Sequence, residues 1–202
     1  MSRGYFIALE GGEASGKSTQ ARILGKAINA VVTREPGGTA LGARMREILL
    51  SKDTVGLTSR AEALLMAADR AQHVEEVVRP TLEAGRHVIT DRHSGSFIAY
   101  QGYGRGLDID AVTKLTQWAT AGLRPDLVVL IDVSSDRTST RRNATQHDRL
   151  DAEDAAFHDR VASGFRSLAV ADPATWVIVD GDGTVNQVQH RIRDAIAERL
   201  GL

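Results

Sequence analysis

The sequence contains no cysteine, which excludes disulfide bonds, thiolate metal sites and a thiol nucleophile. It contains no apolar run near the roughly 20 residues that a membrane-spanning helix needs, and its N-terminal segment has too short an apolar core for a secretory signal. Neither charge is in excess, since 25 basic and 26 acidic residues give a net charge of −1. These absences argue against nucleic-acid and membrane partners and favour a cytoplasmic protein.

The composition that is present belongs to an ordinary globular domain. The 202 residues are 42% hydrophobic and 25% charged, which is too apolar for intrinsic disorder. No internal repeat or Pro-rich linker divides the chain. We therefore expect residues 1–202 to form a single domain.

Five short apolar runs rich in β-branched residues predict the strands. Apolar runs of this length that do not alternate with polar residues are typical of strands buried on both faces of a parallel sheet. Helical patterns separate them, which predicts right-handed βαβ crossovers and a doubly wound α/β fold with helices on both faces. The expected strands cover residues 5–9, 30–33, 87–90, 127–133 and 175–179.

Two helices are clearest from the spacing of apolar residues. One runs from Val185 to Leu200 with apolar side chains at three- and four-residue steps, and we expect it to pack on the sheet. The other covers residues 59–79, and Pro80 is expected to stop or kink it. Residues 134–154 form the most polar stretch, which is either a solvated loop or a short lid of about residues 136–154.

The stretch GGEASGKS, residues 11–18, fits the phosphate-binding pattern G-x-x-x-x-G-K-[ST] between a predicted strand and a predicted helix. Its backbone N–H groups can converge on phosphate oxygens at the start of that helix. We expect Lys17 to bridge the β- and γ-phosphates of a nucleoside triphosphate and the Ser18 hydroxyl to bind Mg²⁺. The predicted nucleotide-binding residues are Gly11, Gly12, Glu13, Ala14, Ser15, Gly16, Lys17, Ser18 and Thr19.

The loop by itself does not separate a kinase from an ATPase or a GTPase. The Asn-Lys-x-Asp tetrapeptide with which a switch GTPase reads guanine is absent from the sequence, which disfavours that class. A plain glycine turn is the structural alternative, and the presence of Lys17 and Ser18 at the required places argues against it.

Charged residues at two further strand ends indicate a second, phosphorylated substrate. Arg34 lies in TREPGGT (33–39), and TDRH (90–93) ends the third strand. A carboxylate such as Asp91 can hold Mg²⁺ or its water, while Arg92 can neutralise charge on a transferring phosphoryl group. An ordinary turn and a surface Asp-Arg pair are the structural alternatives.

A third candidate anion binder, Arg70, lies on the predicted long helix. Met66, Arg70 and His73 are spaced at four and three residues, so they share one face of that helix. A salt-bridged helix surface explains Arg70 about as well. Taken together, Arg34, Arg70 and Arg92 come from separate elements and are expected to line one cleft.

Along almost the whole chain the sequence resembles the thymidylate (dTMP) kinases. The matching segments are the glycine loop, TREPGGT, AADRAQHVEEVVRPTLEAGRHVITDRH, AYQGYGRGLD, PDLVVLIDV and DRLDAEDAAFHDRVASGF, in family order. The resemblance implies a P-loop NTPase-type sheet of about five parallel strands, a short lid and a homodimer. It also implies transfer of the ATP γ-phosphate to dTMP with Mg²⁺, which gives dTDP and ADP for dTTP synthesis.

The resemblance assigns further residues one by one. Glu35 and Pro36 are similar to part of the wall of the monophosphate site, and Arg70 is similar to the arginine that binds the monophosphate. Asp91 and Arg92 match the pair at the phosphoryl-transfer centre, which makes them catalytic candidates together with Lys17. Tyr100 and Gln101 resemble residues that close over the deoxyribose and the base. The substrate-binding candidates are Glu35, Pro36, Met66, Arg70, Arg92, Ser96, Phe97, Tyr100 and Gln101.

One departure from the family lies in the phosphate loop. Some members carry a transition-state arginine directly after an acidic loop residue, and that position here is Ala14, after Glu13. The missing positive charge is expected to come from a lid arginine when the lid closes. Arg141, Arg142 and Arg149 are the candidates, and we take Arg142 and Arg149 as catalytic residues. A solvated loop is the alternative for this stretch.

A second departure lies where the family binds the base. Met66 stands in place of an aromatic residue four positions before Arg70, and Phe97 follows Ser96 where a small polar residue commonly hydrogen-bonds the base edge. We consider a remodelled pocket in which Phe97 supplies the ring and pyrimidine preference is relaxed. A tolerated substitution is the simpler explanation. A kinase for another monophosphate or a small alcohol, or a non-catalytic nucleotide-binding module, would also be compatible with the phosphate loop.

Overall fold

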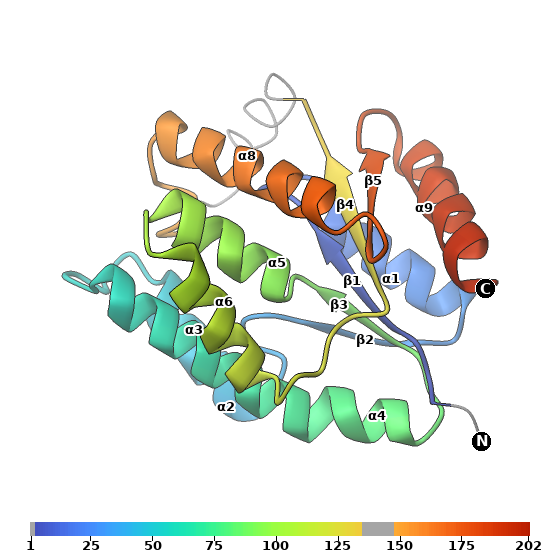
Figure 1. The fold of residues 1–202 in the computed structure, drawn as a ribbon, viewed down its shortest axis with the longest axis horizontal. Coiled ribbons are helices and arrows are strands. Elements are labelled where there is room, and N and C mark those ends of the chain that lie inside the picture. The colour runs from blue at the N-terminus through green and yellow to red at the C-terminus, as the bar shows by residue number, and fades with distance from the viewer. Residues whose placement is uncertain (1–2, 135–147) are drawn as a thin grey trace.

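The strands of the computed structural model, which describes residues 3–134 and 148–202, form a single sheet. All pairs are parallel and the order is β2-β3-β1-β4-β5 (Figure 1). Each expected strand is confirmed to within one residue at either end. The strands are β1 (Phe6–Glu10), β2 (Val31–Arg34), β3 (Val88–Asp91), β4 (Leu127–Asp132) and β5 (Trp176–Asp180).

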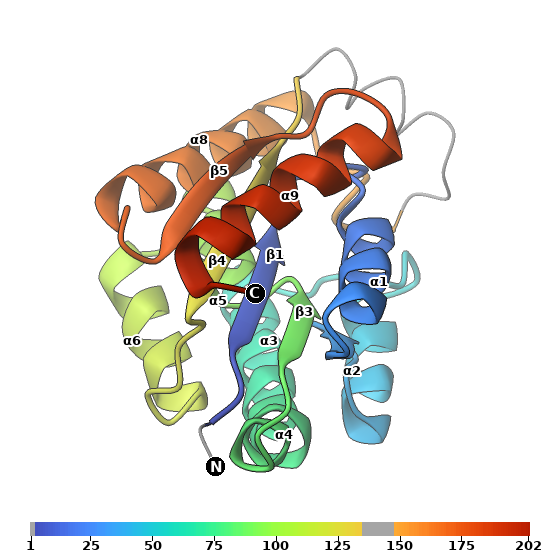
Figure 2. The same cartoon turned by 90° about the vertical axis from the view of Figure 1, so that its right-hand side faces the viewer.

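Helices cover both faces of this sheet, as the alternating sequence pattern predicts (Figure 2). α1 (Lys17–Ala27) and α9 (Val185–Leu200) pack on one face, where Leu24 and Ile192 are buried against the central strands. The other face is covered by helices that share a second apolar core. These helices are α2 (Ala40–Leu50), α3 (Ser59–His73), α6 (Ile109–Ala119) and α8 (Ala155–Ala171).

The long helix does not stop at Pro80, so the expected stop is wrong. α3 continues through the π-helical turn η1 (Val74–Val78) into α4 (Arg79–Glu83). A π turn widens the helix just before the proline, whose ring lacks an N–H donor and crowds the preceding turn. The Thr81 hydroxyl donates to the Val77 carbonyl oxygen at 2.6 Å. The helix therefore passes Pro80, and a side chain bonds one carbonyl oxygen of the turn before it.

A second π-helical segment lies beside the sheet's carboxyl edge. α5 (Ser94–Phe97) follows β3 and runs directly into η2 (Ile98–Gly104). π turns place side chains at angles that an α-helix does not offer and are frequent at functional sites. η2 carries Tyr100 and Gln101, two of the predicted substrate-binding residues.

Because every strand is parallel, all carboxyl ends lie at one edge of the sheet, where β1, β2 and β3 pass into the glycine loop, TREPGGT and TDRH. The chain enters β1 and leaves α9 at the opposite edge (Figures 1 and 2). No helix within residues 3–134 and 148–202 is both long and apolar enough to cross a membrane. Most of the expected lid, including Arg141 and Arg142, lies outside the described residues.

Candidate active site

The loop between β1 and α1 has the backbone that a phosphate site requires. Gly11 and Gly16 have φ angles of 144° and 89°, a region that favours glycine. A Cβ atom on Gly11 would lie 2.6 Å from the Ile131 carbonyl oxygen, so a side chain does not fit there. The first turn of α1 contains no acidic side chain. Its N–H groups can therefore serve an anion.

Lys17 is folded onto this loop and is only 5% exposed. Its Nζ donates to the Gly12 carbonyl oxygen at 2.6 Å and to Ser15 Oγ at 3.0 Å. Burial and the nearby charge of Arg92 lower the pKa of Lys17 to about 8. The ammonium group is thus held where phosphate oxygens would improve its electrostatic environment.

Ser18 and Asp91 meet at the start of α1. The Ser18 hydroxyl donates to Asp91 Oδ2, and β1–β3 pairing sets Leu9 beside Asp91. Asp91 Oδ1 is buried and has no hydrogen-bond partner among the described residues. No group of three His, Asp or Glu side chains in that part of the chain could hold a metal. The two oxygen-bearing residues fit Mg²⁺, which takes few protein ligands and completes its shell with water and phosphate.

Arg92 joins the loop to a cavity on the α3 side of the sheet. Its backbone has a φ of 72°, unusual for a residue with a side chain. Nη1 donates to the Gly11 carbonyl oxygen at 3.0 Å, while Nη2 pairs with Glu13 and lies 3.4 Å from the Tyr100 hydroxyl. Burial alone would lower the pKa of Arg92, but the Glu13 carboxylate reverses this and raises it.

Glu10 supports this corner, and its role was not predicted from the sequence. It is fully buried at the end of β1, and burial raises its pKa. Its Oε1 accepts the backbone N–H groups of His93 and Ser96 at 2.9 and 3.0 Å, and its Oε2 accepts the Ser96 hydroxyl. Ser96 also accepts from Arg92 at 2.9 Å. Glu10 therefore fixes the backbone that carries Arg92.

The cavity beside Arg92 has a volume of about 80 Å³ and reaches the phosphate loop at Glu13. The structure brings all of the predicted substrate-binding residues to its wall. They are Glu35, Pro36, Met66, Arg70, Arg92, Ser96, Phe97, Tyr100 and Gln101. Arg34, in contrast, lines a separate hollow beside Ser18 and Asp91.

Arg46 is a cavity residue that sequence reasoning missed. It lies on α2, and its Nη1 donates to the Pro36 carbonyl oxygen at 2.9 Å. Burial and the charge of Arg34 lower the pKa of Arg46. Within the described residues it has no acidic group at ion-pair distance. Its one sequence signal was a basic residue on the helix after TREPGGT.

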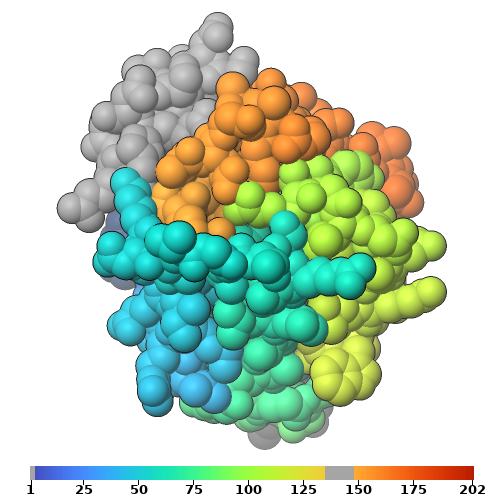
Figure 3. All heavy atoms as spheres, turned by 90° about the vertical axis from the view of Figure 1, so that its left-hand side faces the viewer, coloured from blue at the N-terminus to red at the C-terminus, as the bar shows by residue number. Residues whose placement is uncertain are grey.

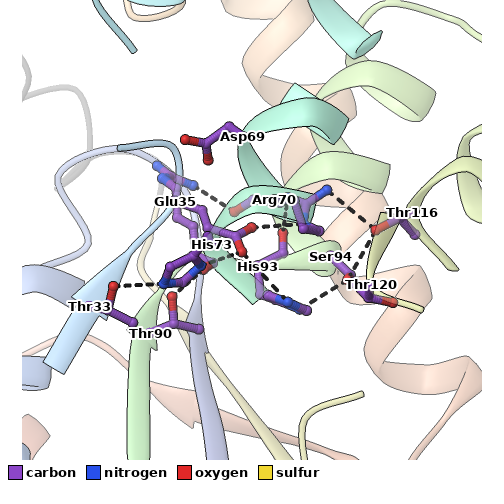
Figure 4. Close-up of polar contacts among 12 residues, drawn as sticks. Thr33, Glu35, Asp69, Arg70, His73, Thr90, His93, Ser94, Thr116 and Thr120 are labelled. Atoms are coloured by element: carbon purple, nitrogen blue, oxygen red, sulfur yellow. Dashed lines mark hydrogen bonds and ion pairs between the residues drawn. The ribbon is translucent and has the colours of Figure 1, made fainter. Parts of the chain in front are cut away.

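Arg70 differs from Arg46 because the carboxylate of Glu35 pairs with its charge. It is 3% exposed, and its Nε donates to Glu35 Oε2 at 2.7 Å (Figure 4). Nη1 and Nη2 donate to Thr116 Oγ1 and the His93 carbonyl oxygen at 3.3 and 3.2 Å. Its guanidinium carbon lies 4.9 Å from the centre of the Phe97 ring. Arg70 thus reaches the cavity as a cation with a hydrogen bond from each guanidinium nitrogen and an aromatic ring beside it.

The remaining wall residues differ in how firmly they are held. Met66 and Phe97 are both buried in one apolar core. Tyr100 donates its hydroxyl to Glu13 Oε1 at 2.9 Å. Gln101 donates its amide to Glu62 Oε1 at 2.9 Å. The described structure therefore ties the η2 side of the cavity both to the phosphate loop and to α3.

The two predicted lid catalysts have different outcomes. Arg142 lies outside the described residues. Arg149 pairs with Glu62 and donates its Nε to the Leu49 carbonyl oxygen at 3.0 Å. It is not on the cavity wall, although its neighbours Asp148 and Leu150 are. In this arrangement Arg149 joins α2 to α3, and its role in transfer stays a prediction.

A second, larger cavity of about 760 Å³ borders the other side of the same loop. It lies between β4 and α8, with Ile131, Val161 and Phe165 among its apolar lining. Gly12, Glu13 and Tyr100 also belong to its wall. The phosphate loop therefore stands between two hollows, and Glu13 and Tyr100 border both.

Comparison with known proteins shows the family to which the chain is similar. Residues 9–192 match the family model described as Thymidylate kinase. The chain is 46% identical to the thymidylate kinase of Exiguobacterium sp. (strain ATCC BAA-1283 / AT1b), covering 98% of this chain and 96% of the relative. It is 47% identical to that of Leifsonia xyli subsp. xyli (strain CTCB07), with the same coverage. The crystal structure of thymidylate kinase from Ehrlichia chaffeensis superposes with a TM-score of 0.80 at 30% identity, over 96% of this chain and 99% of that one.

Proposed function

The chain belongs to the thymidylate kinase family and transfers the γ-phosphoryl group of ATP to dTMP, and we propose a role for each side chain in this reaction. The phosphate loop is the ATP site, and the adjoining cavity beside Arg92 is the dTMP site. The observation that carries the division of roles is the position of Arg92. This one side chain is bonded to the phosphate loop at Gly11 and also lines the cavity that holds every predicted substrate-binding residue. A group between the two sites would therefore meet Arg92.

On the donor side, residues 11–19 hold the phosphates of ATP. Lys17 exchanges its contacts with Gly12 and Ser15 for β- and γ-phosphate oxygens, which are stronger partners for an ammonium. Ser18 and Asp91 would hold Mg²⁺, and the buried Asp91 Oδ1 supports this assignment. When bound, Mg²⁺ supplies positive charge to the phosphate oxygens.

On the acceptor side, the dTMP phosphate lies between Arg92 and Arg46. Among the described residues Arg46 has no acidic group at ion-pair distance, which supports this. Arg92 pairs with Glu13, whose side chain is 26% exposed, whereas Arg70 pairs with the buried Glu35. Arg70 is then a wall of the base end, together with Met66 and Phe97. Glu35 and Pro36 complete this wall, and Tyr100 and Gln101 cover the sugar and base. Since small-molecule sites span roughly 300–1,000 Å³, the cavity has to widen when dTMP enters.

The transfer itself is an in-line displacement. The dTMP phosphate oxygen attacks the γ-phosphorus, the bond to the β-phosphate oxygen breaks, and ADP leaves with that electron pair. No covalent enzyme intermediate is needed, because a phosphate oxyanion is already a nucleophile. The protein's part is placement and charge neutralisation by Lys17 and Arg92. Ala14 leaves the loop without an arginine of its own, so we keep Arg142 and Arg149 as proposed contributors.

The alternative of relaxed pyrimidine preference receives no support from the relatives, which are named thymidylate kinases. One face of the Phe97 ring is covered by Arg70, which leaves less of that ring available to stack on a base. Met66 lies beside it on the cavity wall. We therefore favour a tolerated substitution at these two positions.

We also propose a homodimer of single-domain chains in the cytoplasm, as the family resemblance implies. Figure 3 shows α2, α3 and α6 side by side on one face of the molecule. These helices expose large apolar side chains, of which Trp118 is 81% accessible. Exposed apolar groups on neighbouring helices support an interface there. The residues are Leu41, Ile48, Leu64 and Trp118.

Replacement of Lys17 by alanine tests the assignment. We expect Lys17→Ala to lower kcat/KM for dTMP-dependent ADP formation by at least about 100-fold, the usual cost of a lost charge-stabilising group. The thermal midpoint should change little, because the buried ammonium is not matched by a carboxylate at hydrogen-bond distance. The exposed Lys26→Ala on the same helix is the matched control. Unfolding of Lys17→Ala, or unchanged turnover, would contradict the role given to Lys17.

A further inference from the structure

A chain of buried polar groups begins in the cavity wall at Arg70 and Glu35 and extends away from it through His73 (Figure 4). Glu35 and Arg70 are each only 3% exposed, and His73 and His93 are almost fully buried. His73 Nδ1 lies 2.8 Å from Glu35 Oε1, and His73 Nε2 lies 2.7 Å from Thr33 Oγ1. Thr33 is on β2, one strand residue before Arg34, and does not line the cavity. The chain therefore links an edge strand to Arg70 through two intermediates.

The charges of this chain determine the directions of its hydrogen bonds. Burial alone would raise the pKa of Glu35, but Arg70 and the two histidines outweigh burial and lower it to about 2. Glu35 is therefore a carboxylate that only accepts hydrogen bonds. His73 must therefore donate from Nδ1 to Glu35, and its Nε2 shares a hydrogen bond with the Thr33 hydroxyl, which can donate or accept. Thr33 thus holds the ring nitrogen opposite the one that serves Glu35.

A second histidine competes for the same carboxylate oxygen. His93 Nε2 is 3.7 Å from Glu35 Oε1 and has no hydrogen-bond partner among the described residues. Arg70 Nη1 donates to Thr116 Oγ1, which donates to Ser94 Oγ at 3.1 Å, and Ser94 lies 3.0 Å from His93 Nδ1. This order of donors leaves the His93 proton on Nε2, facing Glu35. Without the His73 donor, the carboxylate could turn toward His93 and away from Arg70.

The His73 ring also packs against the turn after β2. A Cβ atom on Gly38 would lie 2.5 Å from His73 Cδ2 and 2.8 Å from Nε2. The turn after β2 therefore presses its backbone against the ring, and no space remains for the ring to shift that way. Two hydrogen bonds and this contact together hold the His73 ring.

We propose that His73 is a positioning residue for the acceptor site: held by Thr33, it keeps Glu35 against Arg70 and so fixes the guanidinium at the cavity wall. This inference rests on the proposed function, which makes that cavity the dTMP site. It concerns dTMP, because the chain of contacts from Thr33 to Arg70 contains none of the phosphate-loop residues. Removal of the Thr33 hydroxyl should therefore weaken dTMP binding and leave ATP binding unaffected. Thr33 also lines the hollow beside Ser18 and Asp91, so ATP binding has to be measured beside dTMP binding.

The matched variants Thr33→Val and Thr33→Ser test this remotely from the cavity. Calorimetric dissociation constants for dTMP and for ATP are measured on each protein, with steady-state KM and kcat. We expect Thr33→Val to weaken dTMP about fivefold, the net worth of one hydrogen bond, with ATP binding and kcat within about twofold. Thr33→Ser keeps the hydroxyl and should retain wild-type values. Equal losses for both nucleotides, or unchanged dTMP affinity in Thr33→Val, would overturn the proposal.

A second pair serves if Thr33→Val does not fold. His73→Asn keeps a side-chain N–H near the position of Nδ1, whereas His73→Leu has none. We expect dTMP to bind more weakly to the leucine variant, while the asparagine variant stays closer to wild type; equal effects would overturn the proposal. Binding does not require phosphoryl transfer. Wild-type protein that binds dTMP without forming ADP would therefore contradict the proposed activity, but the dTMP affinities of the variants could still be compared. Wild-type protein that does not bind dTMP would overturn both.

Discussion

Lys17 is a buried ammonium whose nearest partners are two loop oxygens, with the cation Arg92 close by. That environment disfavours its charged form, which is why its pKa lies near 8. A triphosphate would bring several negative oxygens to the same place and raise the pKa toward its ordinary value. The residue therefore links nucleotide binding to protonation.

We predict that ATP binding takes up protons above neutral pH. At pH 8 about half of the Lys17 side chains are neutral before ATP binds, so binding should consume roughly half a proton per site, and more at pH 8.5. Calorimetry in two buffers of different ionisation enthalpy measures this number directly. Lys17→Met supplies the control, since it cannot titrate. A proton count that stays constant between pH 7 and pH 8.5 would show that Lys17 is not the titrating group.

At the scale of elements, the turn between β2 and α2 does more than reverse the chain. It carries Glu35 and Pro36 into the cavity wall and sets Gly38 against the His73 ring of α3. The Gly37 N–H donates to Asp69 Oδ1 at 2.9 Å, which adds to the two hydrogen bonds that Glu35 makes to Arg70 and His73 of the same helix. The position of α3 relative to β2 is therefore defined by this turn.

We predict that Gly38→Ala weakens dTMP binding as well as stability. The new Cβ would collide with His73 and would lie 2.7 Å from the Arg34 carbonyl oxygen, so backbone must move, at a cost of about 1–3 kcal/mol. Gly56→Ala is the control: its left-handed backbone costs about 1–2 kcal/mol with no collision. Denaturant unfolding should show both losses, but only Gly38→Ala should raise the KM for dTMP. If the KM for dTMP were unchanged in both variants, this turn would not be linked to the acceptor site.

Much of this arrangement could be predicted from the sequence, and the remainder has a physical reason. Buried parallel strands lack polar alternation, so their five runs stood out, and the glycine loop has a fixed spacing. The pairing of Glu35 with His73 joins residues 38 positions apart, and no local pattern encodes that distance. Arg46 is one basic residue on an amphipathic helix, where charge is ordinary. The helix passes Pro80 because η1 widens it, a tertiary adjustment that proline propensity does not anticipate.

At the scale of the whole molecule, one face carries apolar groups that a monomer would leave in water. α2, α3 and α6 form that face (Figure 3). Arg70 and His73 are buried residues of α3. A partner chain against these helices would therefore restrain the helix that carries the acceptor wall. Association and substrate binding would then act on the same element.

We predict that the protein in solution has twice the mass of one chain and that Trp118→Lys lowers this mass. A charged side chain in place of the largely exposed indole would be costly to bury in an interface. We therefore expect the dissociation constant of the dimer to rise several-fold. Light scattering after size-exclusion chromatography measures the mass, and far-ultraviolet circular dichroism checks that the fold persists. Val170→Lys, on α8 outside this face, is the control. A wild-type monomer, or a dimer that both variants retain, would move the interface elsewhere.

The all-parallel sheet has one practical consequence. Because β1 begins and α9 finishes at the edge away from the strand ends that carry chemistry, both tails of the chain point away from the nucleotides. A fluorescent reporter or a tether to a sensor surface can be attached to either tail without standing in the path of a diffusing substrate. Immobilised molecules would then present their working edge outward to the solution.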